Sequence, residues 1–368
     1  MAIALRPHSE ELSAEVSAFN RRVHSSTNLT YVFPESPVSV WLPKIDGRSI
    51  FQEFFLALDD GTVRGAYILK HQPFLMGNET LSIGYYLPVS EGLFDRKYAS
   101  LAAQLLIDCL RRQPLLYWLG VGGMEQPLPK MLKAARWTLW TIPFYFRVVR
   151  PRAFLHNIAY LRRTKLRKVA LDFLAYFGLG LALRGYQALR TKTPRGISAE
   201  LVPEFGKWAD QIWLAGRSEY KVTAVRDAAS LQILYRPEVP WSFIRLRVKD
   251  GSRDAGWAVC LITKMERDES FGSMRLGSIV DCFARGDDAE KVVAAATSYL
   301  EAAGADLIVT NQSHRAWRAA MERAGYFSGP SRYLIALSPK LSQRLEPLEP
   351  KKDGFHITRG DGDGPIHL

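Results

Sequence analysis

The same order of predicted helices and strands occurs twice along the chain, and this duplication constrains the fold more than any other feature of the sequence. In the first half, hydrophobic periodicity predicts helices over residues 9–23, 97–112 and 128–136 and strands over 50–58, 62–70, 80–87, 115–121 and 138–149. In the second half it predicts helices over 203–214, 227–234, 287–303 and 313–324 and strands over 241–249, 255–265, 275–284, 307–311 and 333–337. Each half therefore runs helix, β-hairpin, strand, helix, strand, helix, strand, which is an internal repeat of element order with little residue identity.

The chain is long enough to hold both copies as separate domains, because 368 residues exceed the usual size of one domain. A turn signal lies in the hairpin of each copy, at Asp59-Asp60-Gly61 and at Asp250-Gly251. We expect a first domain over residues 1–150, a junction over 151–196, a second domain over 197–340 and a polar tail over 341–368.

The junction carries most of the positive charge. Residues 151–195 hold ten Lys or Arg and one acid, Asp172, in a chain whose net charge is +12. The segment 169–183 is apolar apart from Asp172, and its apolar residues surround the helical wheel, which is typical of a helix buried in protein or lipid. Three interpretations remain open: a helix packed between the two domains, a helix lying in an anionic membrane interface, and a membrane span, for which the segment is short.

Cysteine and histidine spacing indicates no metal site. The three cysteines, Cys109, Cys260 and Cys282, lie far apart in apolar contexts, so we expect reduced core cysteines. The seven histidines show no HxxxH spacing, and the chain has no Walker loop, GxGxxG or GxSxG motif. The first ten residues lack the apolar region of a secretory signal, which predicts a cytoplasmic protein. Because the positive charge is local and lies in an apolar context, we do not expect nucleic acid as the main partner.

Two irregular segments carry features of interest. The loop over residues 25–43 contains Tyr31, Phe33 and Trp41, which are aromatic anchors suited to the rim of a substrate site. The tail is rich in proline and ends with Asp361 and Asp363 between glycines. One interpretation of the tail is a loose terminus, and the other is a tail folded over the neighbouring domain with its Asp residues at a substrate.

The most specific local pattern is a strand that ends in Asn, followed by a helix and a Gly-aromatic pair. Residues 308–311 read Ile-Val-Thr-Asn, and residues 324–327 read Ala-Gly-Tyr-Phe. Together with the duplicated element order, this pattern resembles the GNAT acyltransferase fold written twice, over nearly all of residues 1–150 and 197–340. The resemblance implies two α/β domains, each a mixed, mostly antiparallel sheet flanked by helices, and an acyl-CoA cosubstrate. It also implies that Asn311 hydrogen-bonds the pantetheine arm, while a helix cap or turn gives an equally good account of this residue.

The family's loop for the CoA pyrophosphate, with the pattern Q/RxxGxG/A, is only partly represented. In the second half its position contains Arg285 and Gly286, followed by two acids. In the first half it contains Arg96 and Lys97 without the glycine pattern. By the resemblance, these four residues are the candidates for binding the phosphates of CoA.

The candidates for acid–base catalysis lie beside the cleft that the resemblance implies. Asp281 lies on the strand that would line the cleft, where a carboxylate among apolar neighbours is suited to act as a base. His314 begins the helix after Asn311, and Glu91 and Tyr98 are weaker candidates in the first half. The structural alternatives are a salt-bridged or capping carboxylate for Asp281 and a surface helix residue for His314.

With the resemblance, the sequence predicts an acyltransferase that moves an acyl group, expected to be acetyl, from acyl-CoA to an amine or hydroxyl. The acceptor would be a small molecule, a sugar or a lipid-linked compound, because paired GNAT domains resemble enzymes of bacterial cell-wall and polysaccharide pathways. The basic junction suits an anionic membrane surface, which would place the protein at the inner membrane face. Two alternatives stay open: a Fem-like transferase that uses aminoacyl-tRNA, and a non-catalytic scaffold at the membrane surface.

Overall fold

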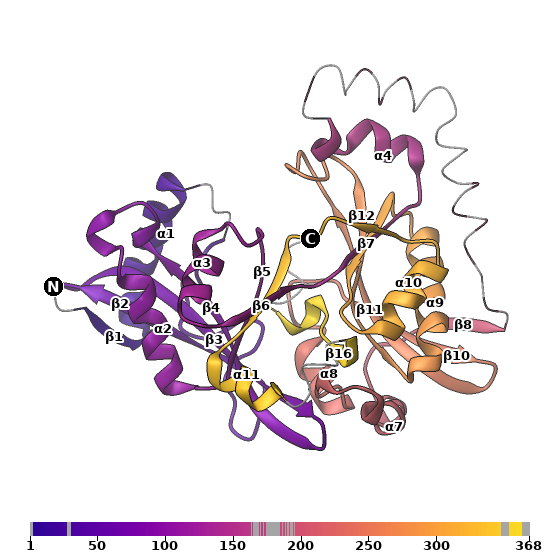
Figure 1. The fold of residues 1–368 in the computed structure, drawn as a ribbon, viewed down its shortest axis with the longest axis horizontal. Helices are drawn as coiled ribbons and strands as arrows, with labels where there is room; N and C mark the ends of the chain where they lie inside the picture. Colours follow the sequence, from indigo (N-terminus) through magenta and orange to yellow (C-terminus); the bar gives the residue numbers. More distant parts are fainter. Residues whose placement is uncertain are drawn as a thin grey trace. The chain divides into compact units, whose positions relative to one another are not determined.

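The computed structural model describes residues 3–27, 31–162, 196–346 and 353–362, together with the single positions 164, 169, 171, 173, 185, 187, 189, 191 and 194. Contacts divide the chain into two units, each built from two pieces (Figure 1). Unit 1 comprises Met1–Thr141 and Arg332–Pro350, and unit 2 comprises Ile142–Ser331 and Lys351–Leu368.

Unit 1 is built on a sheet with the strand order β1-β2-β3-β4-β5-β15-β6. Neighbouring strands are antiparallel except β4 and β5, which are parallel. The strands are β1 (Ala4–Pro7), β2 (Phe51–Asp59), β3 (Thr62–Met76), β4 (Glu79–Ser90), β5 (Leu116–Val121), β6 (Thr138–Thr141) and β15 (Tyr333–Leu337). The helices are η1 (Glu10–Leu12), α1 (Ser13–Ser26), η2 (Glu91–Leu93), η3 (Arg96–Tyr98), α2 (Leu101–Arg112), α3 (Pro127–Ala134) and α11 (Pro339–Leu345).

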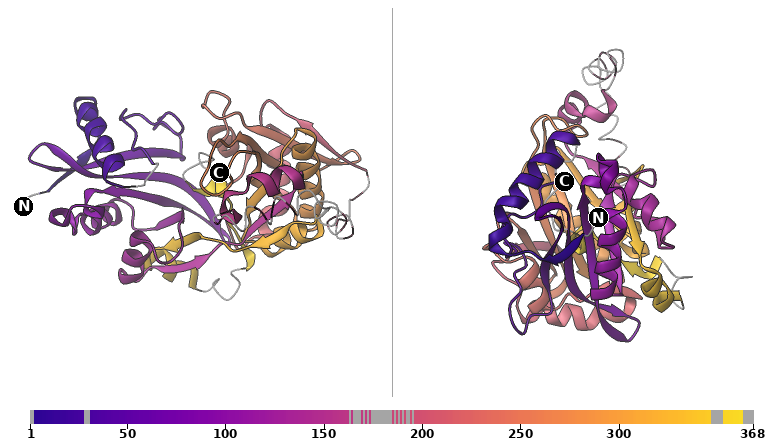
Figure 2. Two further views of the ribbon diagram at one scale, coloured as in Figure 1. Left: turned by 90° about the horizontal axis from the view of Figure 1, so that it is seen from above. Right: turned by 90° about the vertical axis from the view of Figure 1, so that its left-hand side faces the viewer.

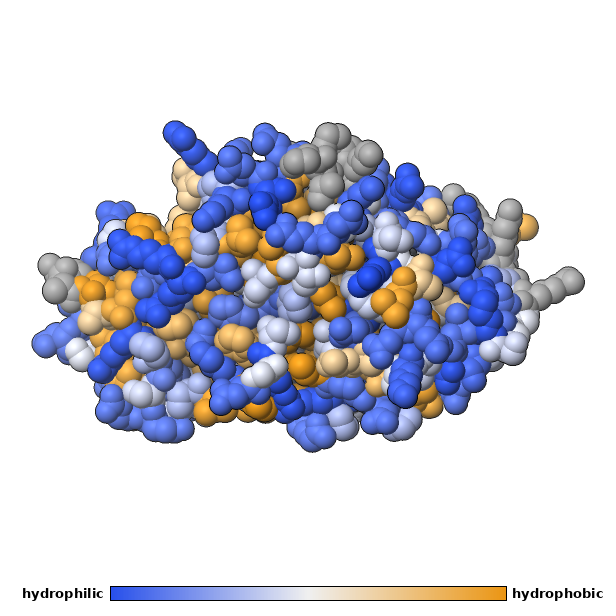
Figure 3. Space-filling model, turned by 90° about the horizontal axis from the view of Figure 1, so that it is seen from below, coloured by the Kyte–Doolittle hydropathy of each residue, from blue (hydrophilic) through white to orange (hydrophobic). Residues whose placement is uncertain are grey.

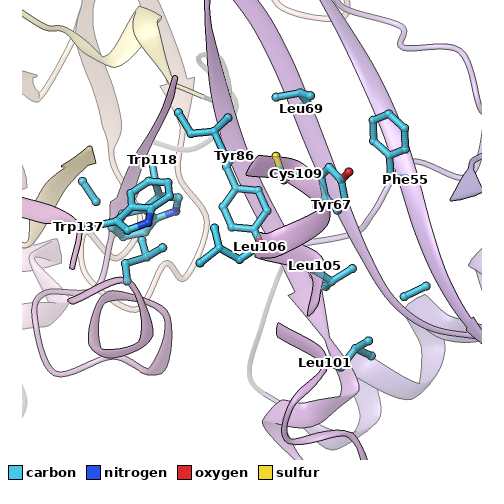
Figure 4. Close-up of a cluster of buried hydrophobic side chains, with 14 of the residues drawn as sticks. Phe55, Tyr67, Leu69, Tyr86, Leu101, Leu105, Leu106, Cys109, Trp118 and Trp137 are labelled. Carbon is cyan, nitrogen blue, oxygen red and sulfur yellow. The ribbon is translucent and has the colours of Figure 1, made fainter. Parts of the chain in front are cut away.

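The two faces of this sheet are covered by different helices. On one face, Val16, Phe19 and Val23 of α1 pack with Ala66 and Ile68 of β3, as the 3–4 spacing of apolar residues predicts. The other face carries a second cluster of buried side chains, in which Tyr67 and Leu69 of β3 lie with residues of α2 such as Leu105 (Figure 4). Because successive side chains of a strand alternate between faces, the even-numbered residues from Ala66 to Gln72 lie on the face of α1, and the odd-numbered residues between them lie on the face of α2.

The turn between β2 and β3 is the one that the sequence predicts. Asp60 and Gly61 have φ angles of 50° and 77°. Two consecutive residues with positive φ make the tight hairpin turn whose twist matches that of the flanking strands, and Asp-Gly is among its preferred sequences.

Unit 2 is built on a sheet with the strand order β14-β7-β13-β12-β11-β10-β8. Here β12 and β13 are the parallel pair, and the other neighbours are antiparallel. The strands of this sheet are β7 (Phe144–Val148), β8 (Ile197–Leu201), β10 (Ile244–Asp250), β11 (Arg253–Lys264), β12 (Arg275–Ala284), β13 (Leu307–Asn311) and β14 (Phe327–Gly329). Two short strands outside it, β9 (Val222–Ala224) and β16 (Phe355–His356), pair with each other in parallel. The helices are α4 (Pro151–Asn157), η4 (Ala159–Leu161), α7 (Lys207–Gly216), η5 (Arg217–Glu219), α8 (Ala228–Leu234), η6 (Gly286–Asp288), α9 (Ala289–Ala302), α10 (Arg315–Arg323) and η8 (Arg359–Asp361).

The two halves of the chain exchange strands. Strand β15 is inserted between β5 and β6 of unit 1, although it follows almost all of unit 2 in the chain. Conversely, β7 pairs with β13 and β14 in the sheet of unit 2. Figures 1 and 2 show the helix that follows β15, α11 in yellow, beside the magenta elements of unit 1.

Because of this exchange, the boundaries of the two units differ from those expected at residues 150 and 340. The single strand expected over 138–149 is two strands, β6 and β7, which belong to different sheets. The break falls at Ile142-Pro143, where a proline cannot donate a ladder hydrogen bond. The carbonyl of Pro143 instead accepts hydrogen bonds from the backbone of Gln312 and the side chain of Asn311, at 3.2 Å each.

Most of the basic junction lies outside the described residues, including residues 174–183 of the apolar segment 169–183. Among the helices that the structure describes, none has the length and apolar character that a membrane span requires. The face drawn in Figure 3 shows hydrophobic side chains in small groups among hydrophilic ones. The three cysteines are free thiols and are buried, as expected.

Candidate functional site

In each unit the two parallel strands separate partway along their length, which opens a gap in the middle of the sheet. In unit 2, β12 and β13 pair only from Leu276↔Leu307 to Ser278↔Val309. Beyond this point β12 continues to Ala284 and β13 ends at Asn311. The predicted site residues Asp281 and Asn311 therefore lie on the two sides of one gap.

The tail of the chain occupies this gap. His356 donates a hydrogen bond from Nε2 to the carbonyl of Cys282 on β12, at 2.8 Å. Arg359 donates from Nε to Oδ1 of Asn311 at the end of β13, also at 2.8 Å. The backbone N–H of Ile357 donates to Ser313 Oγ at 2.7 Å. Residues 353–362 are therefore a folded part of unit 2, and the expectation of a loose terminus is wrong for them.

Asp281 belongs to a saturated ionic network. Its carboxylate accepts hydrogen bonds from Arg226 Nε at 3.1 Å, Tyr235 OH at 2.9 Å and Thr358 Oγ1 at 3.0 Å. Arg226 also contacts Asp361 of the tail, with Nη2 2.9 Å from Oδ2. Burial alone would lower the pKa of Arg226, but the two carboxylates raise it, so the guanidinium stays charged. The carboxylate of Asp281 is thus held in a buried ion pair, as its salt-bridged alternative describes.

Asn311 and His314 are likewise engaged by the protein itself. The side chain of Asn311 accepts from Arg359 and donates to the carbonyl of Pro143, so each end of the amide already has a partner within the chain. His314 is buried as the N-cap of α10, where Nδ1 accepts from the backbone N–H of Ala316 at 3.3 Å. Burial, with the nearby charge of Arg315, lowers the pKa of His314 to about 4. With Nδ1 accepting, the neutral ring carries its proton on Nε2 and has no lone pair left to act as a base.

The position expected to bind phosphate in unit 2 carries a carboxylate. The backbone N–H of Gly286 donates to Glu219 Oε2 at 2.6 Å, and Arg285 lies 3.6 Å from the same side chain. Asp288, at the start of α9, is paired with Arg253 and Lys291. An anionic ligand would therefore meet like charge here, as the two acids in the sequence already indicate.

In the corresponding loop of unit 1, the charged side chains of Glu91 and Lys97 are paired with other residues of the unit. Glu91 is buried and accepts from Arg22 Nε at 2.7 Å and Arg64 Nη1 at 3.0 Å, so it is held in ion pairs and is not a free base. Lys97 donates to Asp59 Oδ2 at 3.0 Å, and the hydroxyl of Tyr98 donates to the same oxygen at 2.9 Å.

Arg96 is exposed in the turn before α2. Helix α2 begins without a side-chain cap, and basic residues next to a helix N-terminus suit an anion.

A row of polar and aromatic side chains crosses unit 1 where β4 and β5 separate. These strands pair only at Gly84↔Leu116 and Tyr85↔Tyr117. Tyr85 lies opposite Lys70 of β3, and Lys70 lies opposite Gln52 of β2. These three side chains and that of Tyr117 therefore share the face of α1. Lys70 is buried, with Nζ 5.5 Å from the ring centre of Trp41 and 5.4 Å from that of Tyr85.

The sequence analysis did not identify this row. The signal was present, because Lys70 and Gln72 occupy the same alternate positions of β3 as the buried Ala66 and Ile68. The strand expected over 62–70 ended too early to show it, since β3 runs to Met76. Among the described residues, no group of His, Cys, Asp or Glu side chains is arranged to hold a metal ion.

No model of a protein family matches the sequence, and no curated protein matches it. Solved structures do match. A probable N-acyltransferase of Enterococcus faecalis V583, described as a conserved protein of unknown function, superposes with a TM-score of 0.52 at 9% identity, over 94% of this chain and 74% of that one. N-myristoyltransferase of Saccharomyces cerevisiae with bound myristoyl-CoA superposes with a TM-score of 0.54 at 9% identity, over 92% of this chain and 79% of that one. At such identities the likeness shows the fold alone.

Proposed function

We propose that this chain, which has the GNAT fold twice, is an acyl-CoA-dependent N-acyltransferase whose reaction centre lies in unit 1. The observation that carries the choice of unit is the tail segment 353–362, which fills the gap between β12 and β13 of unit 2. Glu219 on the backbone of Gly286 adds to this argument, because it takes the place of a phosphate. The corresponding gap of unit 1, between β4 and β5, is the donor site of the proposal.

The reaction joins an amine to the acyl group of a thioester. The amine nitrogen attacks the thioester carbonyl, the C–N bond forms and the C–S bond breaks. The amine loses a proton, and the thiolate of CoA gains one. In the proposal, backbone N–H groups at the edge of the gap stabilise the oxyanion, and the exposed Arg96 before α2 attracts the phosphates of CoA, while Lys97 is paired with Asp59.

Calorimetric titration of the full chain with acetyl-CoA, and with a long-chain acyl-CoA, tests the donor site. Arg96→Ala is expected to weaken binding about tenfold, since a charge-assisted hydrogen bond contributes about 1.5–3 kcal/mol. Arg285→Ala is the matched control in unit 2 and is expected to leave binding unchanged. Binding that is lost in Arg285→Ala or Asn311→Ala, but kept in Arg96→Ala, would move the donor site to unit 2.

Absence of binding by any acyl-CoA would overturn the proposal. Salt-sensitive binding of aminoacyl-tRNA would then favour the Fem-like alternative. Binding to vesicles alone would favour the non-catalytic scaffold.

The charge of residues 151–195 supports a second part of the proposal, an acceptor presented at an anionic membrane surface. Flotation with vesicles that contain phosphatidylserine tests it. Binding that decreases as salt is raised would support a peripheral location, and equal binding to neutral vesicles would contradict it.

A further inference from the structure

Gln72 of β3 is a buried carboxamide with neither end paired. The side chain has 0% of its surface exposed, and both Nε2 and Oε1 lack a hydrogen-bond partner. A buried polar group without a partner costs free energy, so native proteins rarely keep one unless something else supplies the partner.

Other glutamines of the chain show how a structural residue is satisfied. Gln52, in the row next to Gln72, accepts from Ser39 Oγ at 2.7 Å. Gln312 of unit 2 donates from Nε2 to Thr310 Oγ1 at 3.1 Å, although its Oε1 has no partner. Among these three buried or partly buried amides, Gln72 is the one in which neither the amide nitrogen nor the amide oxygen has a hydrogen-bond partner.

The position of Gln72 relates it to the reaction centre. It lies two residues after Lys70 on the same strand, so both side chains emerge on the face of α1, about 7 Å apart along the strand. Lys70 is opposite Tyr85, at the point where β4 and β5 separate. Gln72 itself lies opposite Ile83, two residues before Tyr85 on β4, so the open amide adjoins the end of the gap at which the proposed donor would present its thioester.

Aromatic rings surround this face of the sheet. The ring centres of Tyr85 and Tyr117 are 5.5 Å apart, and those of Phe74 and Tyr117 are 5.4 Å apart. Trp41, from the loop that the sequence marks as a substrate rim, contacts Lys70 from outside the sheet. Rings around a few placed polar groups are typical of sites that bind small organic molecules.

The chemistry of a carboxamide limits what can pair with both of its ends. The Nε2 group needs an acceptor, and Oε1 needs a donor. A carboxylate or phosphate offers only acceptors and would leave Oε1 unpaired beside another oxygen. An amide group, –CO–NH–, offers an acceptor and a donor together and matches Gln72 in two hydrogen bonds.

We propose that Gln72 is the specificity-determining residue of the acceptor site and that it selects an amine whose molecule also carries an amide group. The inference rests on the proposed function for the role of the bound molecule as acceptor. The recognition of the amide itself is independent of acyl transfer and can be measured without it.

The experiment compares binding of phenylacetamide and phenylacetate to the full chain by calorimetry and ligand-observed NMR. The two probes have the same ring, and only the first has an amide. We expect phenylacetamide to bind at least tenfold more tightly than phenylacetate, a difference of about 1.4 kcal/mol. Gln72→Leu is expected to abolish this preference, while the control Gln312→Leu, which changes a buried amide of unit 2, keeps it.

The fold of the variants is checked by thermal unfolding. Gln72→Leu removes a buried unpaired amide without removing a hydrogen bond, so its melting temperature is expected to be equal to or above that of the original chain. Gln72→Met serves as a second apolar variant of similar length. Equal binding of the two probes, no binding of either, or a preference that survives both variants would overturn the proposal.

The acetyl-CoA titration separates this proposal from the proposed function. An amide preference that depends on Gln72, without any acyl-CoA binding, would keep the recognition site and reject the acyltransferase. Acyl-CoA binding without an amide preference would keep the acyltransferase and reject the role of Gln72.

Discussion

Arg226 and Asp361 are 135 positions apart in the chain, yet Nη2 of the arginine lies 3.0 Å from Oδ1 and 2.9 Å from Oδ2 of the aspartate. The same guanidinium binds Asp281, so a single cation ties the tail to β12. Replacement by methionine would leave two buried carboxylates without a counter-charge. We expect Arg226→Met to destabilise unit 2 by about 3–5 kcal/mol, measured by urea-induced unfolding at pH 7.

Limited proteolysis reports on the same contact. Trypsin is expected to cleave after Arg359 in Arg226→Met, because the tail is no longer held, and to spare this bond in the original chain. Arg323→Met is the control, since the pair of Arg323 with Glu290 is more exposed and its loss should change stability by no more than about 1 kcal/mol. A tail that stays protected in Arg226→Met would contradict the assignment.

The buried His314 makes the stability of unit 2 depend on pH. Its pKa in the folded protein is about 4, against 6.5 for the free side chain. The unfolded chain therefore binds the proton more tightly, and the free energy of unfolding should fall as the pH drops from about 6.5 to about 4, by at most about 3 kcal/mol. Urea unfolding at pH 7.5, 5.5 and 4.5 measures this decrease.

His314→Asn tests the attribution, because asparagine keeps an N-cap acceptor for Ala316 and does not titrate. The decrease should become smaller but remain in part, since burial also lowers the pKa of His356. An unchanged decrease in His314→Asn would assign the pH dependence to other groups.

The insertion of β15 predicts a long-range effect on unit 1. Ile335 pairs with Leu119 on one side and Trp140 on the other. Ile335→Pro removes a ladder donor from an interior strand, and we expect amide hydrogen exchange to rise sharply in β5 and β6. Ile335→Val, which costs about 1 kcal/mol, should leave protection there nearly intact. Loss of protection confined to residues 333–345 would contradict the pairing.

The loop before α2 is shaped by a glycine. A Cβ atom at Gly92 would lie 2.4 Å from the carbonyl oxygen of Tyr98. Any other residue must therefore displace η2 and η3 from each other. Gly92→Ala should destabilise unit 1 by about 1–3 kcal/mol and weaken acyl-CoA binding, because Arg96 lies in the displaced segment. Gly206→Ala, whose Cβ would meet its nearest atom at an ordinary 3.6 Å, is the control. Equal affinity in Gly92→Ala and the original chain would separate this loop from the donor site.

Hydrophobic periodicity predicted the order of helices and strands, the resemblance of that order to the GNAT fold predicted two α/β domains with mixed sheets, and the superposed structures confirm this fold. Strand β12 was predicted with its observed ends, as were β13 and β15. These elements are defined by local pattern. The pairing of β15 is not defined by local pattern, because the sequence of an apolar strand such as Tyr333–Leu337 does not indicate which sheet the strand joins.

The candidate site was predictable only in part, for the same reason. Asp281 and Asn311 do line one gap, as the resemblance implies. Their partners Arg226 and Arg359 come from an irregular segment and from the tail, where no periodicity gives a position. In unit 1, the buried row around Lys70 was hidden by a strand end predicted six residues too early, at residue 70 instead of Met76.

The exchanged strand also affects how the protein is made. A ribosome that has finished residue 141 has still to add nearly two hundred residues before β15 is complete, which takes about 10–40 s at about 5–20 residues per second. During that time β5 and β6 have no neighbour between them, and unpaired strand edges invite association with other chains. The first half of the gene product must therefore wait for the last part of translation, and molecular chaperones that shield nascent chains have a defined interval in which to act.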